Sequence, residues 1–137
     1  KRLAELLRDR LGKKVLIGLQ DPIRLDKFSE PQPDISVLIR RDDFYSGSHP
    51  TARDVYLLIE VAETSVEFDR TIKLDLYAQA NIPEVWLIDL QNEAIEAYRD
   101  PRNKQYQGKD QLKRGQSLSS NALPELKLAV DDIFGAI

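Results

Sequence analysis

Two acids and a lysine, Asp34, Glu60 and Lys73, have the types and surroundings to carry chemistry. Glu60 interrupts the apolar stretch 55–62, in which no turn residue accounts for its charge. A strand that is apolar on both faces belongs in the middle of a covered sheet. A carboxylate in such a strand must be paired or bound to a metal ion. We therefore take Glu60 as the centre of a candidate site.

Asp34 and Lys73 are the candidates for the groups around Glu60. Asp34 follows Pro33 at the start of another apolar stretch, and Lys73 lies on the amphipathic segment after the Glu60 strand. If Asp34 and Glu60 lie on neighbouring strands, their carboxylates could hold one hard cation such as Mg²⁺, completed by water and the carbonyl of Val61. Such a cation binds a phosphate oxygen and lowers the pKa of a bound water. A lysine beside it would orient that water or neutralise the developing charge.

Helix geometry directs Lys73 toward this site. Side chains lean toward the N-terminus of their helix, so Lys73 points back to the end of the strand that carries Glu60. Asp69 and Tyr77 lie one turn before and after Lys73 on the same face, where they could support the site without binding the metal. By spacing alone, Asp69 and Lys73 would form a surface pair worth about 0.3–0.5 kcal/mol. Tyr77 would ordinarily be a core residue.

The elements that must position these residues alternate between strand and helix. Hydrophobic periodicity predicts helices over 1–11 and 64–80, strands over 15–19, 34–39, 55–63, 84–90 and 94–98, and short strands at 23–25, 105–107 and 127–130. Gly12 is expected to end the first helix, a Thr64–Glu67 capping box to begin the second, and a turn to span 100–103. The strand–helix–strand unit over 55–90 should be a right-handed parallel crossover. We expect a three-layer α/β/α domain with a central mixed sheet.

Length and composition describe an ordinary globular domain. The 137 residues predict one domain over 1–137, with 42% hydrophobic and 31% charged residues. No apolar run could span a membrane, and the absence of cysteine excludes a disulfide framework and fits a cytoplasmic setting. Because the chain starts at Lys1 and contains no methionine, we expect N-terminal residues to be missing. A net charge of −3 argues against bulk attraction to nucleic acid, but permits an enzyme that touches a few phosphates.

Taken together, these residues resemble the PD-(D/E)XK nuclease superfamily, and more closely its Uma-two branch of restriction endonucleases. The matching positions are Pro33-Asp34, Ile59-Glu60-Val61, Thr64-Ser65, Asp69 to Lys73, Tyr77-Ala78, Ile82-Pro83-Glu84, Trp86 and Asp89. The wider superfamily places its lysine two residues after the glutamate, where this chain has Ala62. Here the lysine lies on the following helix, as it does in the Uma-two branch.

The resemblance implies a restriction-endonuclease-like fold and hydrolysis of phosphodiester bonds, in DNA, that depends on Mg²⁺ with Mn²⁺ as a substitute. It implies Asp34 and Glu60 as metal ligands and Lys73 as the catalytic lysine. Nucleic acid is the expected partner, with a second copy of the chain as another and no membrane. The residues alone leave two alternatives open. Glu60 and Lys73 could be a buried ion pair in a non-catalytic interaction or dimerisation domain, or the chain could be the nuclease subunit of a larger assembly.

Overall fold

The centre of the structure is a six-stranded mixed sheet in which the strands lie side by side in chain order. The computed structural model describes residues 2–63 and 67–135, with the backbone alone for residues 67–71. The strands are β1 (Val15–Leu19), β2 (Ile35–Ile39), β3 (Val55–Ala62), β4 (Glu84–Asp89), β5 (Ala94–Arg102) and β6 (Gln105–Lys113). The pairing of β3 with β4 is parallel, and the other described pairings in this sheet are antiparallel.

The parallel pair follows from the helix α2 (Glu67–Gln79) between β3 and β4, because parallel neighbours need a long crossover. Asn81 ends this helix in the left-handed conformation, with φ of 62°. The N–H of Ile82 then donates to the carbonyl of Tyr77 at 3.1 Å, the bond of a Schellman motif. Ile82 is fully buried, so the chain enters β4 at a fixed angle. The proposed cap at Thr64 lies outside the described residues.

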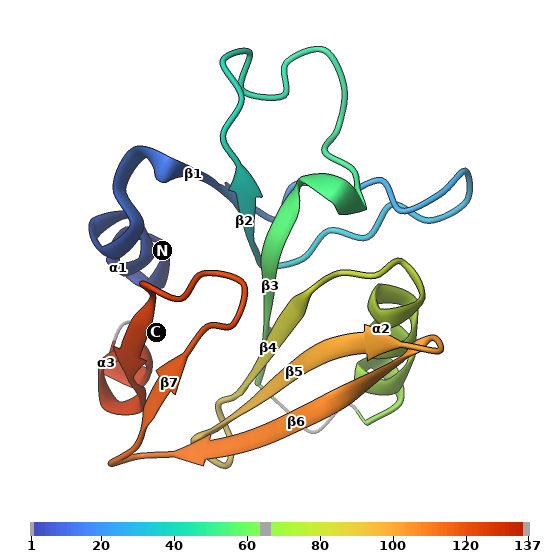
Figure 1. Cartoon of the computed structure of the whole chain (residues 1–137). Coiled ribbons are helices and arrows are strands. Elements are labelled where there is room, and N and C mark those ends of the chain that lie inside the picture. Colours follow the sequence, from blue (N-terminus) through green and yellow to red (C-terminus); the bar gives the residue numbers. More distant parts are fainter. Residues whose placement is uncertain (1, 64–66, 136–137) are drawn as a thin grey trace.

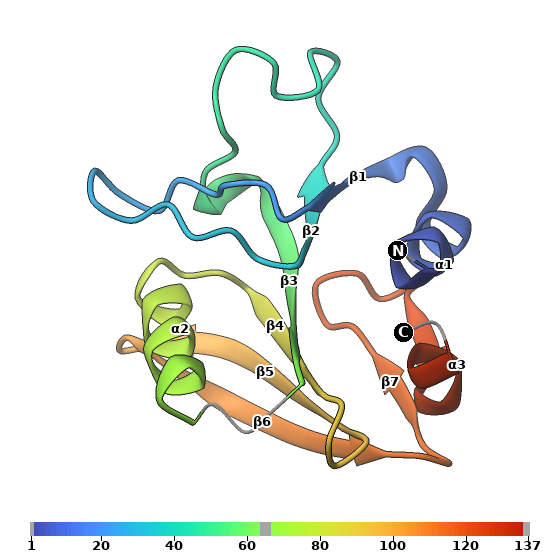
Figure 2. The same ribbon diagram turned by 180° about the vertical axis from the view of Figure 1, so that it is seen from behind.

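Two helical layers cover the sheet, as Figures 1 and 2 show from opposite sides. One face packs on α1 (Arg2–Leu11), α3 (Val130–Gly135) and a small antiparallel pair, β7 (Ser117–Ser119) with β8 (Lys127–Ala129), around Trp86. The other face packs on α2 around Tyr77 and Leu58. The predicted three-layer α/β/α class with a central mixed sheet is therefore confirmed.

Most predicted elements are present, and the differences have local causes. Gly12 ends α1 with φ of 62°, as expected, and opens the short 3₁₀ turn η1 (Gly12–Lys14). Residues 23–25 do not form a strand; Arg24 makes an isolated bridge with Thr51. Thr51 is the residue just before the 3₁₀ turn η2 (Ala52–Asp54). The turn expected over 100–103 instead falls at Asn103 and Lys104, both left-handed, which suits a two-residue hairpin. As a result β6 runs for nine residues, where a three-residue strand was expected.

No helix among residues 2–63 and 67–135 combines the length and the apolar character needed to cross a membrane.

Candidate active site

The register of β2 against β3 places Asp34 opposite Glu60. Ile35 pairs with Ile59 in this antiparallel ladder, so the next position outward on each strand is Asp34 and Glu60. Residues directly opposite in such a ladder have Cα atoms about 4.5–5.5 Å apart and side chains on one face. The face is the one covered by α2, because the neighbouring side chains of Leu38 and Leu58 belong to that cluster. The two carboxylates expected to form one site are thus cross-strand neighbours.

Asp34 is fixed by the backbone of the strand that carries Glu60. Its Oδ2 accepts a hydrogen bond from the N–H of Val61 at 2.7 Å, while its own carbonyl accepts from Gln20. Asp34 Oδ1 has no hydrogen bond within the described part of the chain. In an extended strand the N–H and C=O of one residue point to the same side. The carbonyl of Val61 therefore lies on the same edge of β3 as Asp34.

Glu60 is 7% exposed, and two side chains of α2 contact its carboxylate. The hydroxyl of Tyr77 donates to Oε2 at 2.6 Å, and Nζ of Lys73 lies 3.5 Å from Oε1. Burial raises the pKa of Glu60, the bond from Tyr77 and the charge of Lys73 lower it, and the charge of Asp34 raises it. Burial also raises the pKa of Tyr77, so its hydroxyl stays protonated and acts as a donor.

The side chain of Lys73 contacts Glu60 and is also partly exposed to solvent. Its side chain is 48% exposed, whereas that of Glu60 is 9% exposed. An ammonium group that is partly exposed to solvent and lies beside a carboxylate can move toward a substrate without a large change in its burial. Asp69 was expected one turn before Lys73, but its side chain lies outside the described ones. Tyr77 lies where the sequence placed it and contacts Glu60 directly.

The donor set fits a hard divalent cation. Asp34 and Glu60 supply oxygens from adjacent strands, and the Val61 carbonyl lies on the same edge. Within the described residues no group of three or more acidic, histidine or cysteine side chains could hold a metal. Mg²⁺ commonly takes one or two carboxylates and keeps several waters for substrate phosphates. The pair Asp34 and Glu60 is therefore suited to Mg²⁺ rather than to a metal that needs a closed protein cage.

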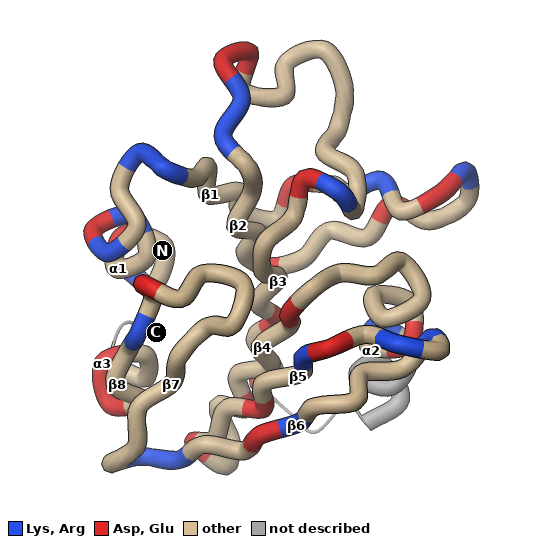
Figure 3. The backbone as a smooth tube through the Cα atoms, in the orientation of Figure 1, with Lys and Arg blue, Asp and Glu red and all other residues tan. Residues whose placement is uncertain are grey.

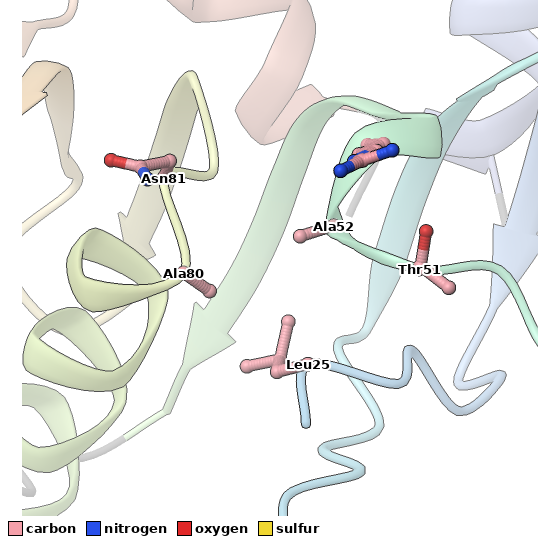
Figure 4. A pocket seen from close by; sticks show the side chains of 6 residues that line it. Leu25, Thr51, Ala52, Ala80 and Asn81 are labelled. Atoms are coloured by element: carbon pink, nitrogen blue, oxygen red, sulfur yellow. The ribbon is translucent and has the colours of Figure 1, made fainter. Parts of the chain in front are cut away.

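A cleft of about 500 Å³ lies on the same face of the sheet, beyond the C-terminal end of α2. Its apolar lining comes from Leu25, Ala52 and Ala80, which pack against the cluster around Tyr77. Figure 4 shows these three side chains pointing into the cleft, with β3 behind them. Asn81 and Arg53 add polar groups at the rim. Ala52 and Arg53 precede β3 and Glu60 lies near its C-terminal end, so the cleft lies toward the other end of this strand from Glu60.

Sequence reasoning missed a second buried acid, Glu84 at the start of β4. It is fully buried and lies on the opposite face of the sheet, with Trp86. Its carboxylate accepts hydrogen bonds from the indole of Trp86 at 2.9 Å, the guanidinium of Arg99 at 3.2 Å and the hydroxyl of Ser120 at 2.7 Å. The backbone N–H groups of residues 121 and 122 also donate to it. The signal was present, because Glu84 opens an apolar strand just as Glu60 interrupts one.

A mixed sheet between two helical layers, with a carboxylate pair and a lysine on one face, defines a domain of the restriction-endonuclease-like class. The chain belongs to the Uma2 family, described as "putative restriction endonuclease", whose family model matches residues 1–131.

Among solved structures, the chain is similar to the crystal structure of "a putative nuclease belonging to DUF820" from Anabaena variabilis. The TM-score is 0.78 at 18% sequence identity, and the match covers 98% of this chain and 76% of that chain. At this identity the likeness shows the fold. No curated protein matches the chain.

Proposed function

We propose that this protein is a divalent-metal-dependent nuclease that hydrolyses phosphodiester bonds, with DNA as its substrate. The observation that carries the proposal is the convergence of Asp34, Glu60 and Lys73, which come from the residue just before β2, from β3 and from α2. Membership of the Uma2 family supports the reaction class. The substrate and the metal are inferred from the chemistry of the side chains.

In this proposal Asp34 and Glu60 hold Mg²⁺, or Mn²⁺ in its place, together with the carbonyl of Val61. Bound there, the ion would polarise the phosphate and lower the pKa of a water. The N–H of Val61 fixes the Asp34 carboxylate, and the hydroxyl of Tyr77 fixes that of Glu60, so both ligands are oriented beforehand. Fixed ligands avoid reorganisation at the moment of reaction.

Lys73 supplies the positive charge that the reaction needs on the phosphate side. Its ammonium contacts Glu60 at 3.5 Å, at the long end of a hydrogen bond. A phosphodiester entering the site would compete for this ammonium, which can then orient the attacking water or stabilise the charge of the transition state. Because Lys73 is partly exposed, its ammonium can leave Glu60 and bind the phosphate.

The charge pattern explains why a metal would also help to hold the substrate. The chain has a net charge of −3, and Figure 3 shows basic and acidic residues interspersed along the backbone. A dispersed pattern gives little bulk attraction to a polyanion. A cation between Asp34 and Glu60 would turn a locally negative site into one that attracts phosphate.

Calorimetric titration with Mg²⁺ and Mn²⁺, paired with cleavage of plasmid and single-stranded DNA, tests the proposal. Wild type should bind one ion and cleave, and Asp34→Asn and Glu60→Gln should lose both properties while remaining folded. Asp132→Asn, an exposed acid on α3 in the opposite layer, is the matched control and should behave as wild type. Absence of both metal binding and cleavage in wild type would leave a non-catalytic domain with a buried ion pair.

A further inference from the structure

The two edge strands of the six-stranded sheet differ in chemical character. One of them, β6, includes Lys109, Asp110 and Lys113 among its nine residues. Charged side chains on an edge strand discourage pairing with another chain. The other edge strand is β1, whose five residues are all apolar. Among the described strands β1 pairs with β2 alone, and we call the side of β1 that faces away from β2 its outer edge.

The pairing of β1 with β2 fixes which backbone groups point to the outer edge. The N–H of Gln20 donates to the carbonyl of Asp34, so the backbone at position 20 points toward β2. In an antiparallel ladder every second residue of a strand bonds to the same neighbour. Positions 16 and 18 therefore also bond to β2, and positions 15, 17 and 19 point outward. Ile17 is the central one of these three.

Exposed apolar side chains lie on and beside β1. Among the described residues five large hydrophobic side chains are exposed, and three of them are in this region. Leu19, in β1, is 41% exposed, and Ile39, at the end of β2, is 39% exposed. Phe44 is 62% exposed and lines a pocket of about 360 Å³ over Gly18, beside β1. Apolar side chains exposed together beside an unpaired strand edge indicate an interaction surface.

We propose that a second copy of this chain pairs with the outer edge of β1, antiparallel and centred on Ile17, to form one continuous sheet. In this register Ile17 lies opposite Ile17 of the second copy, and Val15 lies opposite Leu19. All these residues point outward, so each pair exchanges two backbone hydrogen bonds. The carbonyl of Val15 would exchange its long bond of 3.4 Å from Arg40 for one from the second copy. The two copies use the same surface, as a two-fold axis requires.

The side chains of β1 are self-complementary in this register. On one face Ile17 meets its own copy and Val15 meets Leu19, so both kinds of pair are apolar. On the other face Leu16 lies opposite Gly18 of the second copy and covers it. Position 18 accepts no larger residue within the chain, because a Cβ there would lie 2.5 Å from Ser36 Oγ. Cross-strand pairs of this kind stabilise a sheet.

Charges at the two ends of β1 favour an antiparallel partner. Lys13 and Lys14 precede the strand and Asp21 follows it, while Lys14 also contacts Glu125 at 3.5 Å. In an antiparallel pair the start of one strand lies beside the end of the other. Lys13 of each copy would therefore approach Asp21 of the other copy. A parallel partner would bring like charges together at both ends, and such charge patterns set the orientation of an interface.

Sedimentation equilibrium over a dilution series tests for the dimer. Wild type should be dimeric at micromolar concentrations. Leu19→Lys should raise the dissociation constant about a hundredfold, because the two-fold axis places the new charge against an apolar residue twice. Ile72→Lys, at a 49% exposed position on α2, is the matched control and should remain dimeric. A monomeric wild type, or a Leu19→Lys variant as dimeric as wild type, would overturn the proposal.

A single thiol at the centre of the pairing tests the register. The chain contains no cysteine, so Ile17→Cys carries one thiol per copy. Cα atoms of a hydrogen-bonded antiparallel pair are about 5.5 Å apart, which a disulfide can span, so mild oxidation should link two copies. Leu19→Cys is the control, because its two thiols would lie four residues apart, about 14 Å along the strands, and should not link. Linking through Leu19→Cys but not through Ile17→Cys would contradict the proposed pairing.

Amide hydrogen exchange of wild type decides the question even if the cysteine variants fail to fold. In the dimer the N–H groups of Ile17 and Leu19 should exchange as slowly as those of Leu16 and Gly18, which bond to β2. In the Leu19→Lys monomer the N–H of Ile17 should exchange much faster than its two neighbours. Slow exchange of Ile17 in a monomeric wild type would mean that another segment of the protein covers the outer edge, and would overturn the proposal. None of these measurements involves DNA or a metal ion, so this interface and the proposed function stand or fail separately.

Discussion

Glu60 is the residue whose surroundings are hardest to reconcile with a purely structural role. It is buried beside Asp34, a like charge, and burial is the largest influence that raises its pKa. A carboxylate retained only for stability would gain more from apolar neighbours. Its two donors, Tyr77 and Lys73, stabilise the charged form without removing the repulsion from Asp34. A divalent ion between the two acids would remove it.

The raised pKa of Glu60 predicts a pH dependence of stability. In the folded protein this pKa lies above the usual 4.5, so the contribution of Glu60 to the free energy of unfolding is greatest below pH 4.5. The contribution falls as the pH rises through the folded pKa, because the folded state then has to carry a buried charge. Urea unfolding across a pH series, with a chelator present, should show wild type losing stability relative to Glu60→Gln as the pH rises.

Saturating Mg²⁺ should abolish this loss, since the ion favours the ionised carboxylate. Wild type that instead gains stability relative to Glu60→Gln as the pH rises would mean that the donors, and not burial, dominate the pKa of Glu60.

Lys73→Met separates catalysis from structure at a single residue. The substitution keeps the length and packing of the side chain and removes the charge, so metal binding by Asp34 and Glu60 should persist. Cleavage should fall by about 10²–10³-fold, as when one transition-state donor is removed. The melting temperature should change little, because Lys73 is 48% exposed and its contact with Glu60 is long. Lys127→Met, on β8 in the opposite layer, is the matched control for both measurements.

At the scale of elements, hydrophobic patterning predicted the strands that carry the site. The sequence placed Asp34 at the start of one strand and Glu60 within another, but their adjacency was a hypothesis, and the register of β2 against β3 brings them opposite each other. The hairpin of β5 and β6 was harder, because its turn signals, Asp100 and Pro101, lie inside β5. Asp100 is accommodated there with φ of 59°, and the turn forms at the next left-handed pair. The composition of this region therefore predicted a turn but not that the turn forms at Asn103 and Lys104.

Glu84 shows how one strand holds a distant segment in place. Its carboxylate gathers donors from β4, β5 and the segment 120–122, which are far apart in sequence, and so no local pattern could predict the contact. This segment leads into β8 and α3, whose buried side chains complete the core around Trp86. These hydrogen bonds to Glu84 lie on the face of the sheet opposite to Asp34 and Glu60.

Glu84→Gln should therefore destabilise the fold without abolishing the metal site. Losing the charge weakens the bond from Arg99 and replaces an acceptor oxygen by a donor, which should lower the free energy of unfolding by about 3 kcal/mol. Hydrogen exchange should accelerate first in β7, β8 and α3. Mg²⁺ affinity, measured below the unfolding temperature, should stay within about threefold of wild type. Loss of metal binding with intact α2 would show that the two faces are coupled.

At the scale of the whole molecule, the sequence predicted the layers but not the cavities. The cleft beside α2 and the pocket over Gly18 are built from loops 20–33 and 40–54, which regular periodicity does not describe. The isolated bridge between Arg24 and Thr51 joins these two loops. Both hollows lie on the face of the sheet that carries Asp34 and Glu60, and neither is lined by Asp34, Glu60 or Lys73.

The acidic character of the whole chain sets its expected behaviour toward DNA. With a net charge of −3 and dispersed basic residues, the protein should bind DNA weakly in a chelator and more tightly when a divalent ion fills the site. Ca²⁺, a hard cation that also takes oxygen ligands, can fill the site while the affinity is measured by fluorescence anisotropy over a salt series. A contact with about two or three phosphates predicts a slope of roughly −2 to −3 in log K against log salt. Asp34→Asn should remove the effect of Ca²⁺, whereas a slope of about −8, unchanged by chelator, would indicate a broad basic surface and contradict a metal-centred mode of binding.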